Sequence, residues 1–136
     1  MMMLGFSWKN YRKRKQKPKR WKYSSTEGHV VHGELPIDTI KRELQEELGI
    51  NTCDDDLKLI VTFKHPSKNC IFNVYLINLD IPLNKIILQS EEVEKVEYLT
   101  TTEIEKIIDN SNFFESHAYI FNNYIKEQKW DNQNKF

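Results

Sequence analysis

Apolar residues between positions 36 and 50 repeat with the period of an α-helix. The apolar positions are Ile37, Ile40, Leu44 and Leu48. At about 100° per residue they fall on one narrow stripe, which must face a core. Pro36 suits the first helical turn, where no backbone N–H is needed, and Gly49 suits a left-handed helix cap. The pattern therefore predicts a helix over residues 36–48.

Runs of alternating, β-branched and aromatic residues predict strands after this helix. Residues 57–63 place Leu57, Leu59, Val61 and Phe63 on one face. A polar turn separates this strand from a second one, which we expect to be central in the sheet. The remaining predicted elements are a second strand over 70–79, an edge strand at 86–88, a ragged apolar segment within 89–100, and helices over 102–110 and 113–129. The second of these helices starts a new apolar stripe, beside which His117 is interpreted as a packing residue.

Composition is typical of one soluble domain. The chain has 136 residues and a formal net charge of zero, which excludes a disordered polyelectrolyte. Cys53 and Cys70 form neither a metal-type spacing nor a disulfide framework. No apolar run is long enough to span a membrane, and the N-terminus reverses the order of a secretory signal. We expect a cytoplasmic protein without a membrane partner.

Charge is distributed unevenly along the chain. Residues 1–22 hold nine Lys or Arg and no acid, whereas the remainder holds 11 basic and 20 acidic residues. The basic stretch is interpreted as a solvated N-terminal arm with a partial strand, from which Arg14 and Lys19 are candidates for contacting substrate phosphates. A nucleic-acid or membrane-surface patch is the alternative. The folded domain is expected over 23–130, followed by a polar tail over 131–136.

Three carboxylates share an arc of the predicted helix. Glu43 lies three residues before Glu46 and four before Glu47, and each like-charge pair costs about 0.2–0.5 kcal/mol. The arc is either the solvated face of an amphipathic helix or a site for a hard cation such as Mg²⁺. The upstream spacing of Gly28 and Glu34 favours the second interpretation, because helix propensity does not require it.

The stretch 28–50 is similar to the signature of the Nudix hydrolases. The matching positions are Gly28, Glu34, Arg42, Glu43, Leu44, Glu46, Glu47, Gly49 and Ile50, with no insertion or substitution. The resemblance implies an α/β fold, a Nudix-type α/β/α sandwich around a mixed β-sheet. Part of the chain also resembles the subgroup near isopentenyl-diphosphate isomerases, through Pro18, Trp21, Ser24 or Ser25, Gly28 and His29.

That subgroup has a long apolar strand before the basic stretch, in the middle of the sheet. Here the corresponding region begins MMMLGFSWKN. Either the usual first strand is missing, or residues 4–8 substitute for it. A missing central strand would leave backbone groups unpaired and part of the core open.

The resemblance also implies a reaction: Mg²⁺-dependent hydrolysis of a phosphoanhydride in a nucleoside diphosphate linked to another moiety, with Mn²⁺ as an alternative ion. The implied metal ligands are Glu43, Glu46, Glu47 and the carbonyl of Gly28. Arg42 would orient Glu43, and Glu34 would support the loop. The base would be Glu43, Glu92 (with Glu91 as runner-up) or another carboxylate that does not bind metal.

Other functions stay open. An isomerase on this fold needs a Cys immediately before the Gly-His pair, and this chain has Glu27 there. A non-catalytic nucleotide or RNA sensor usually loses signature carboxylates, and none is lost here. Nucleic-acid binding through residues 9–22 is the weaker third hypothesis. Oligomeric state cannot be read from the pattern.

Overall fold

A computed structural model of the chain describes residues 2–7, 22–77, 81–88 and 93–127. Its strands are β1 (Met2–Ser7), β2 (Leu57–Lys64), β3 (Ile71–Ile77) and β4 (Val93–Leu99); its α-helices are α1 (Pro36–Leu48), α2 (Thr101–Asp109) and α3 (Glu115–Ile120). Short 3₁₀ turns cover Asp54–Asp56 and Leu83–Lys85, and a π-helical turn, Phe121–Ile125, continues α3. The predicted roles of Arg14, Lys19, Pro18, Trp21, Glu91 and Glu92, and the tail over 131–136, lie outside the described residues.

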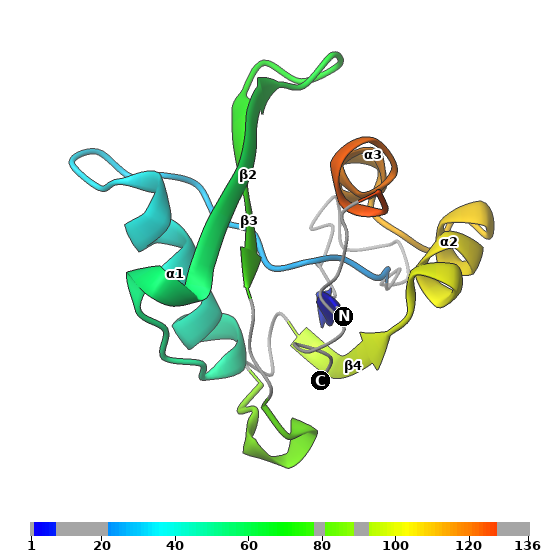
Figure 1. The fold of residues 1–136 in the computed structure, drawn as a ribbon, viewed down its shortest axis with the longest axis horizontal. Coiled ribbons are helices and arrows are strands. Elements are labelled where there is room, and N and C mark those ends of the chain that lie inside the picture. Colours follow the sequence, from blue (N-terminus) through cyan, green and yellow to red (C-terminus); the bar gives the residue numbers. More distant parts are fainter. Residues whose placement is uncertain (1, 8–21, 78–80, 89–92, 128–136) are drawn as a thin grey trace, which may run out of the picture.

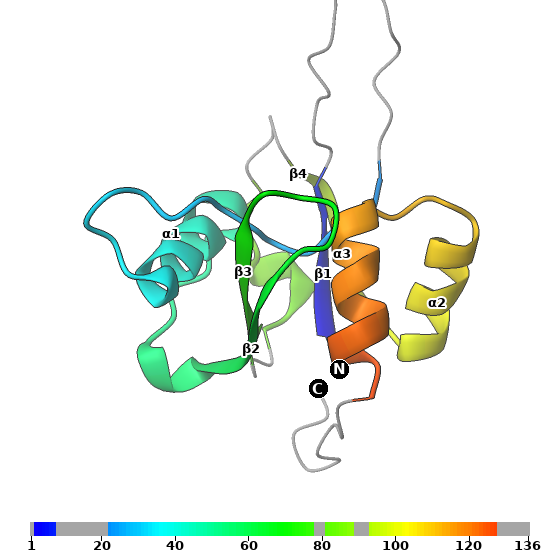
Figure 2. The same cartoon turned by 90° about the horizontal axis from the view of Figure 1, so that it is seen from above.

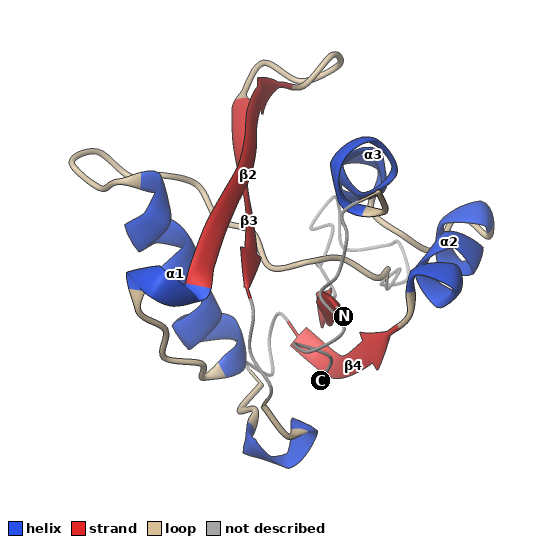
Figure 3. Ribbon diagram, viewed as in Figure 1, coloured by secondary structure: helices blue, strands red, loops and turns tan. Residues whose placement is uncertain are grey.

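The helices lie on two sides of the strands. α1 is on one side of the β2–β3 hairpin, and α2 and α3 are on the other, as two perpendicular views agree (Figure 1, Figure 2, Figure 3). This arrangement confirms the predicted α/β class with helices on both faces. Of the described helices, none is both long enough and apolar enough to cross a membrane.

The strands form two antiparallel pairs. β1 pairs with β4, and β2 pairs with β3. Within the described ranges the one parallel pairing is an isolated bridge between Tyr23 and Phe113. In place of one continuous mixed sheet, these residues therefore form two antiparallel strand pairs. A strand does form at Met2–Ser7, and it overlaps residues 4–8, which were expected to substitute for the usual first strand if that strand is missing.

The hydrophobic core has two parts that meet at β4. The buried residues of the first part, between α1 and β4, are Leu44, Leu48, Ile50, Val93 and Val96. Those of the second part, around α2 and α3, are Val74, Leu99, Ile104, Phe113, Phe121 and Ile125. Because β4 contributes to both parts, it connects the signature helix to the C-terminal helices.

The prediction for the signature helix is confirmed. Pro36 starts α1, and Gly49 adopts a left-handed conformation with φ of 65°, which a residue without Cβ accepts at low cost. The backbone N–H of Ile87 donates to the carbonyl of Leu48 at 3.0 Å. The predicted edge strand at 86–88 is therefore wrong: this segment is not a strand, and its backbone satisfies the end of the helix instead.

The β2–β3 hairpin forms as predicted, but the apolar side chains of β2 do not all lie on one face. The register shifts between Leu59 and Val61, and such an irregularity moves the following side chains relative to the sheet faces. Leu59 is consequently 50% exposed, contrary to the single apolar face expected for β2. β3 was expected to be central, yet in the described part of the chain it pairs only with β2.

The C-terminal helices begin and end differently from the prediction. α2 starts one residue earlier than expected, because Thr100 is its N-cap and forms the capping box with Glu103. The Glu103 carboxylate accepts from the Thr100 backbone N–H at 2.7 Å, and the Thr100 hydroxyl accepts from the Glu103 N–H at 3.2 Å. The helix expected over 113–129 is instead α3 followed by the π-helical turn.

Thr100→Ala should lower the free energy of unfolding by about 1 kcal/mol, because it removes the N-cap acceptor of α2. The matched control is Thr102→Ala in the same helix, which should change stability by less than about 0.5 kcal/mol. Urea unfolding monitored by circular dichroism measures both. Equal losses for the two variants would contradict the assignment of the cap.

Candidate functional site

The chain before the signature is attached to the start of α3. Tyr23 donates its backbone N–H to the carbonyl of Asn112 at 2.8 Å and accepts from the N–H of Phe114 at 3.0 Å. These two bonds form the parallel bridge to Phe113. Ser24, next along the chain, is fully buried. The loop that leads to Gly28 therefore starts from a fixed position.

Gly28 is packed against the signature helix. A Cβ atom built at Gly28 would lie 2.2 Å from Cγ of Glu43 and 2.5 Å from its Oε1. No side chain can occupy that space without displacing Glu43, so close approach, rather than backbone conformation, requires glycine here. The loop and α1 therefore meet at the carboxylate that the signature places in the site.

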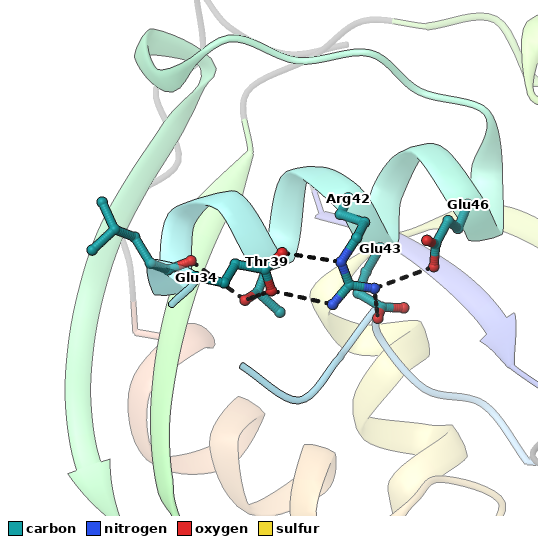
Figure 4. A network of polar contacts seen from close by, with 6 residues as sticks. Glu34, Thr39, Arg42, Glu43 and Glu46 are labelled. Carbon is teal, nitrogen blue, oxygen red and sulfur yellow. Dashed lines mark hydrogen bonds and ion pairs between the residues drawn. The ribbon is translucent and has the colours of Figure 1, made fainter. Parts of the chain in front are cut away.

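Arg42 is the centre of a network of ion pairs (Figure 4). Its Nε and Nη2 donate to the two oxygens of Glu34, each at 3.2 Å. Its Nη1 donates to Glu43 at 2.9 Å and to Glu46 at 3.4 Å. Thr39, buried on α1, also donates its hydroxyl to Glu34. One guanidinium thus contacts three carboxylates, two from α1 and one from the preceding turn.

This network perturbs the titration of its members. Hydrogen bonds from Arg42 and then from Thr39 lower the pKa of Glu34 below its ordinary value. Hydrogen bonding to Glu34 likewise raises the pKa of Arg42 above its ordinary value. The pair is charged at neutral pH, and Arg42 supplies the positive charge that offsets its carboxylate neighbours.

The predicted metal ligands lie in different environments. The side chain of Glu43 is 15% exposed and that of Glu46 is 47% exposed, whereas Glu47 is buried with 3% exposure. Among the described residues, no three His, Cys, Asp or Glu side chains converge where they could hold a metal ion. The carboxylate oxygens of Glu43, Glu46 and Glu47 are nevertheless the type of ligand that Mg²⁺ prefers. Gly28, whose carbonyl is the fourth predicted ligand, lies against Glu43.

A cavity of about 590 Å³ opens beside Glu43 and Glu47, whereas Glu46 is not among the residues that line it. Gly28, Glu43 and Glu47 line it, together with residues of α3 and each residue from 70 to 77. Successive side chains of a strand point to opposite faces, so a strand that lines a cavity with every residue presents its edge to it. The cavity therefore runs along the edge of β3 opposite β2, between α1 and α3.

His117 and Glu27 form a polar contact that the sequence did not predict. Nε2 of His117 lies 2.8 Å from the carboxylate of Glu27, and Nδ1 accepts from the backbone N–H of Ser25 at 3.0 Å. His117 is buried, as expected of a packing residue, and its ring also has two polar partners that this interpretation did not include. The residues lie 90 positions apart, so no local pattern could have paired them.

Comparison with known proteins supports the fold. The protein DR0079 from Deinococcus radiodurans superposes with a TM-score of 0.59 at 18% identity, over 82% of this chain and 65% of that one. Among curated proteins, Nudix hydrolase 3 of Arabidopsis thaliana is 31% identical over a 116-residue alignment that covers 76% of this chain. The 8-oxo-dGTP diphosphatase of Haemophilus influenzae is 41% identical over 51 residues, or 38% of this chain.

The chain spans only part of these two curated relatives, 14% of the Arabidopsis protein and 38% of the Haemophilus protein. The family model, in contrast, covers most of this chain: the model described as NUDIX domain matches residues 10–121. The match includes the whole stretch from Gly28 to Ile50 and the loop and helices that surround it. The chain belongs to the Nudix family.

Proposed function

We propose that this protein is a Mg²⁺-dependent hydrolase that cleaves a phosphoanhydride in a nucleoside diphosphate linked to another moiety. One observation carries the proposal: Glu43 and Glu47 of the signature helix line the same cavity of about 590 Å³ as the loop residue Gly28. That volume is of the size that small-molecule sites have. The names of the relatives, a Nudix hydrolase and an 8-oxo-dGTP diphosphatase, support this class of reaction.

The donor chemistry fits a hard divalent cation. Glu43, Glu46, Glu47 and the carbonyl of Gly28 offer oxygen atoms only, and the Gly28–Glu43 contact brings the loop against the helix. These residues would hold Mg²⁺, with Mn²⁺ as a substitute. Such an ion, when bound, neutralises charge on a diphosphate and lowers the pKa of a coordinated water.

The chain's own residues position the carboxylates. Arg42 contacts Glu43 directly and holds Glu34 through both carboxylate oxygens. A bidentate contact restricts a guanidinium more than a single bond does, so Glu34 fixes Arg42 and Arg42 orients Glu43. Glu43, the predicted Glu92 or another carboxylate that does not bind metal would accept the proton of the attacking water.

Several predictions remain proposals. Arg14 and Lys19 are the proposed contacts to substrate phosphates, and a small-molecule diphosphate is the proposed partner. Nucleic-acid binding through residues 9–22 stays a weaker alternative, as do isomerisation and a non-catalytic sensor function. A cytoplasmic location also remains a prediction.

Glu46→Gln should reduce Mg²⁺-dependent hydrolysis by about 100-fold or more, because it removes a charged oxygen ligand from a site that must bind a cation. The measurement is release of phosphate or nucleoside monophosphate across ADP-ribose, dinucleoside polyphosphates, NADH, nucleoside triphosphates, capped RNA and isopentenyl diphosphate. Glu127→Gln, an exposed carboxylate outside the cavity, is the matched control and should retain activity. Unchanged hydrolysis in Glu46→Gln would disprove the metal assignment, and no hydrolysis by the folded wild type would favour the sensor.

Glu34→Gln should destabilise the protein at about pH 7 and much less at about pH 3. The pKa of Glu34 is lowered in the folded state, so its stabilising contribution is present above the ordinary pKa and is lost as the pH falls through the lowered one. Urea midpoints of wild type, Glu34→Gln and the control Glu127→Gln at both pH values test this. If the urea midpoints of wild type and Glu34→Gln differ as much at about pH 3 as at about pH 7, the stabilising role of the ionised Glu34 carboxylate is contradicted.

A further inference from the structure

Glu27 and His117 extend the polar chemistry of the cavity to the wall opposite the signature helix. Both residues line the cavity, as do Gly28 and Glu43. Glu27 precedes Gly28 in the loop, and His117 belongs to α3. Since α1 and α3 lie on opposite sides of the hairpin (Figure 1, Figure 2), the contact with His117 holds Glu27 toward the α3 wall.

The hydrogen bonds define the protonation of the imidazole. A backbone N–H can only donate, so Nδ1 of His117 must accept the bond from Ser25. The proton of the neutral ring is then on Nε2, which donates to the Glu27 carboxylate at 2.8 Å. The side chain of His117 is 3% exposed and that of Glu27 is 35% exposed. Both side chains line the cavity, but His117 is buried whereas Glu27 is the more accessible of the two.

The surroundings of Glu27 restrict what can bind beside it. At the wall formed by α3 and the residues that flank it, Phe113, Ile120 and Phe121 line the cavity beside the polar Ser116 and His117. A carboxylate accepts hydrogen bonds and donates none, so a phosphate oxygen would meet repulsion there. An alkyl chain would remove water from the carboxylate without replacing its hydrogen bonds, which is unfavourable. A hydroxyl or amino group replaces them.

We propose that Glu27 is a specificity-determining residue that binds a hydroxyl or amino group on the non-phosphate part of the substrate, and that His117 is the positioning residue that orients it. The inference rests on the proposed function, because it assumes that the diphosphate lies at the α1 wall. It narrows the substrate class to diphosphates of nucleosides or other donor-bearing groups. Alkyl diphosphates are disfavoured.

Two non-hydrolysable probes distinguish a specificity role of Glu27 from an effect of Glu27 on the cation or on the fold. Adenosine 5′-(α,β-methylene)diphosphate carries hydroxyl and amino donors, and methylenediphosphonate carries none beyond its phosphonates. Calorimetric titration in Mg²⁺ should show that Glu27→Gln weakens the nucleoside probe about tenfold and changes the affinity for methylenediphosphonate less than about twofold.

Substitutions of His117 test the positioning role. Gln can place an amide N–H near the position of Nε2, whereas Asn can replace only the acceptor at Nδ1. His117→Gln should therefore keep most of the affinity for the nucleoside probe, and His117→Asn should lose it as Glu27→Gln does. Urea midpoints identify any variant that does not fold. If His117→Asn does not fold, the result for Glu27→Gln tests the proposal.

Equal weakening of both probes by Glu27→Gln would overturn the proposal, because Glu27 would then act on the cation or on the fold. Unchanged affinity for both probes, or a wild type that binds neither, would overturn it as well. If the wild type binds the nucleoside probe with this dependence on Glu27 but hydrolyses nothing in the substrate panel, the specificity role stands and the proposed hydrolase function fails.

Discussion

The ion pairs of Arg42 hold the candidate site together. The residue contacts Glu34 through two nitrogen atoms and Glu43 and Glu46 through a third. Carboxylates on adjacent turns of one helix repel each other, and a guanidinium among them removes that cost while fixing their directions. Because Glu34 belongs to the turn before α1, the same contacts also join the loop to the helix. The loop also approaches the same Glu43 side chain closely at Gly28.

The second constraint is the attachment of the loop to α3. Main-chain bonds at Tyr23 and the imidazole of His117 fix the loop at that end, and Gly28 against Glu43 fixes it at the other. Two signature carboxylates, Glu43 and Glu47, thus line the cavity from α1, and a further carboxylate, Glu27, lines it where the loop contacts α3. The apolar edge of β3 lies between them. In the proposed function, the diphosphate would lie at the α1 wall and the donor-bearing group at the α3 wall.

The local elements of this fold could be predicted from sequence, and the long-range contacts could not. Apolar periodicity, Pro36 in the first turn and Gly49 at the end located α1, since helix ends depend on local chemistry. The bulge in β2 and the use of residues 86–88 to cap α1 depend on neighbours far along the chain. The same is true of His117: its apolar flank predicted burial correctly, but its bonds to Ser25 and Glu27 arise only from the tertiary fold. The spacing of the signature indicated the candidate metal-binding carboxylates and an Arg42–Glu43 pair. It did not indicate that Arg42 also contacts Glu34 and Glu46.

The central claim, that the carboxylates of α1 bind a divalent cation, can be measured directly with Mn²⁺ by electron paramagnetic resonance. The wild type should bind Mn²⁺ at a saturable site from which Mg²⁺ displaces it. The Glu43→Gln/Glu46→Gln double variant, verified as folded by circular dichroism, should lose that binding. If the double variant binds Mn²⁺ as tightly as the wild type, or the wild type binds none, the signature helix is not a metal site.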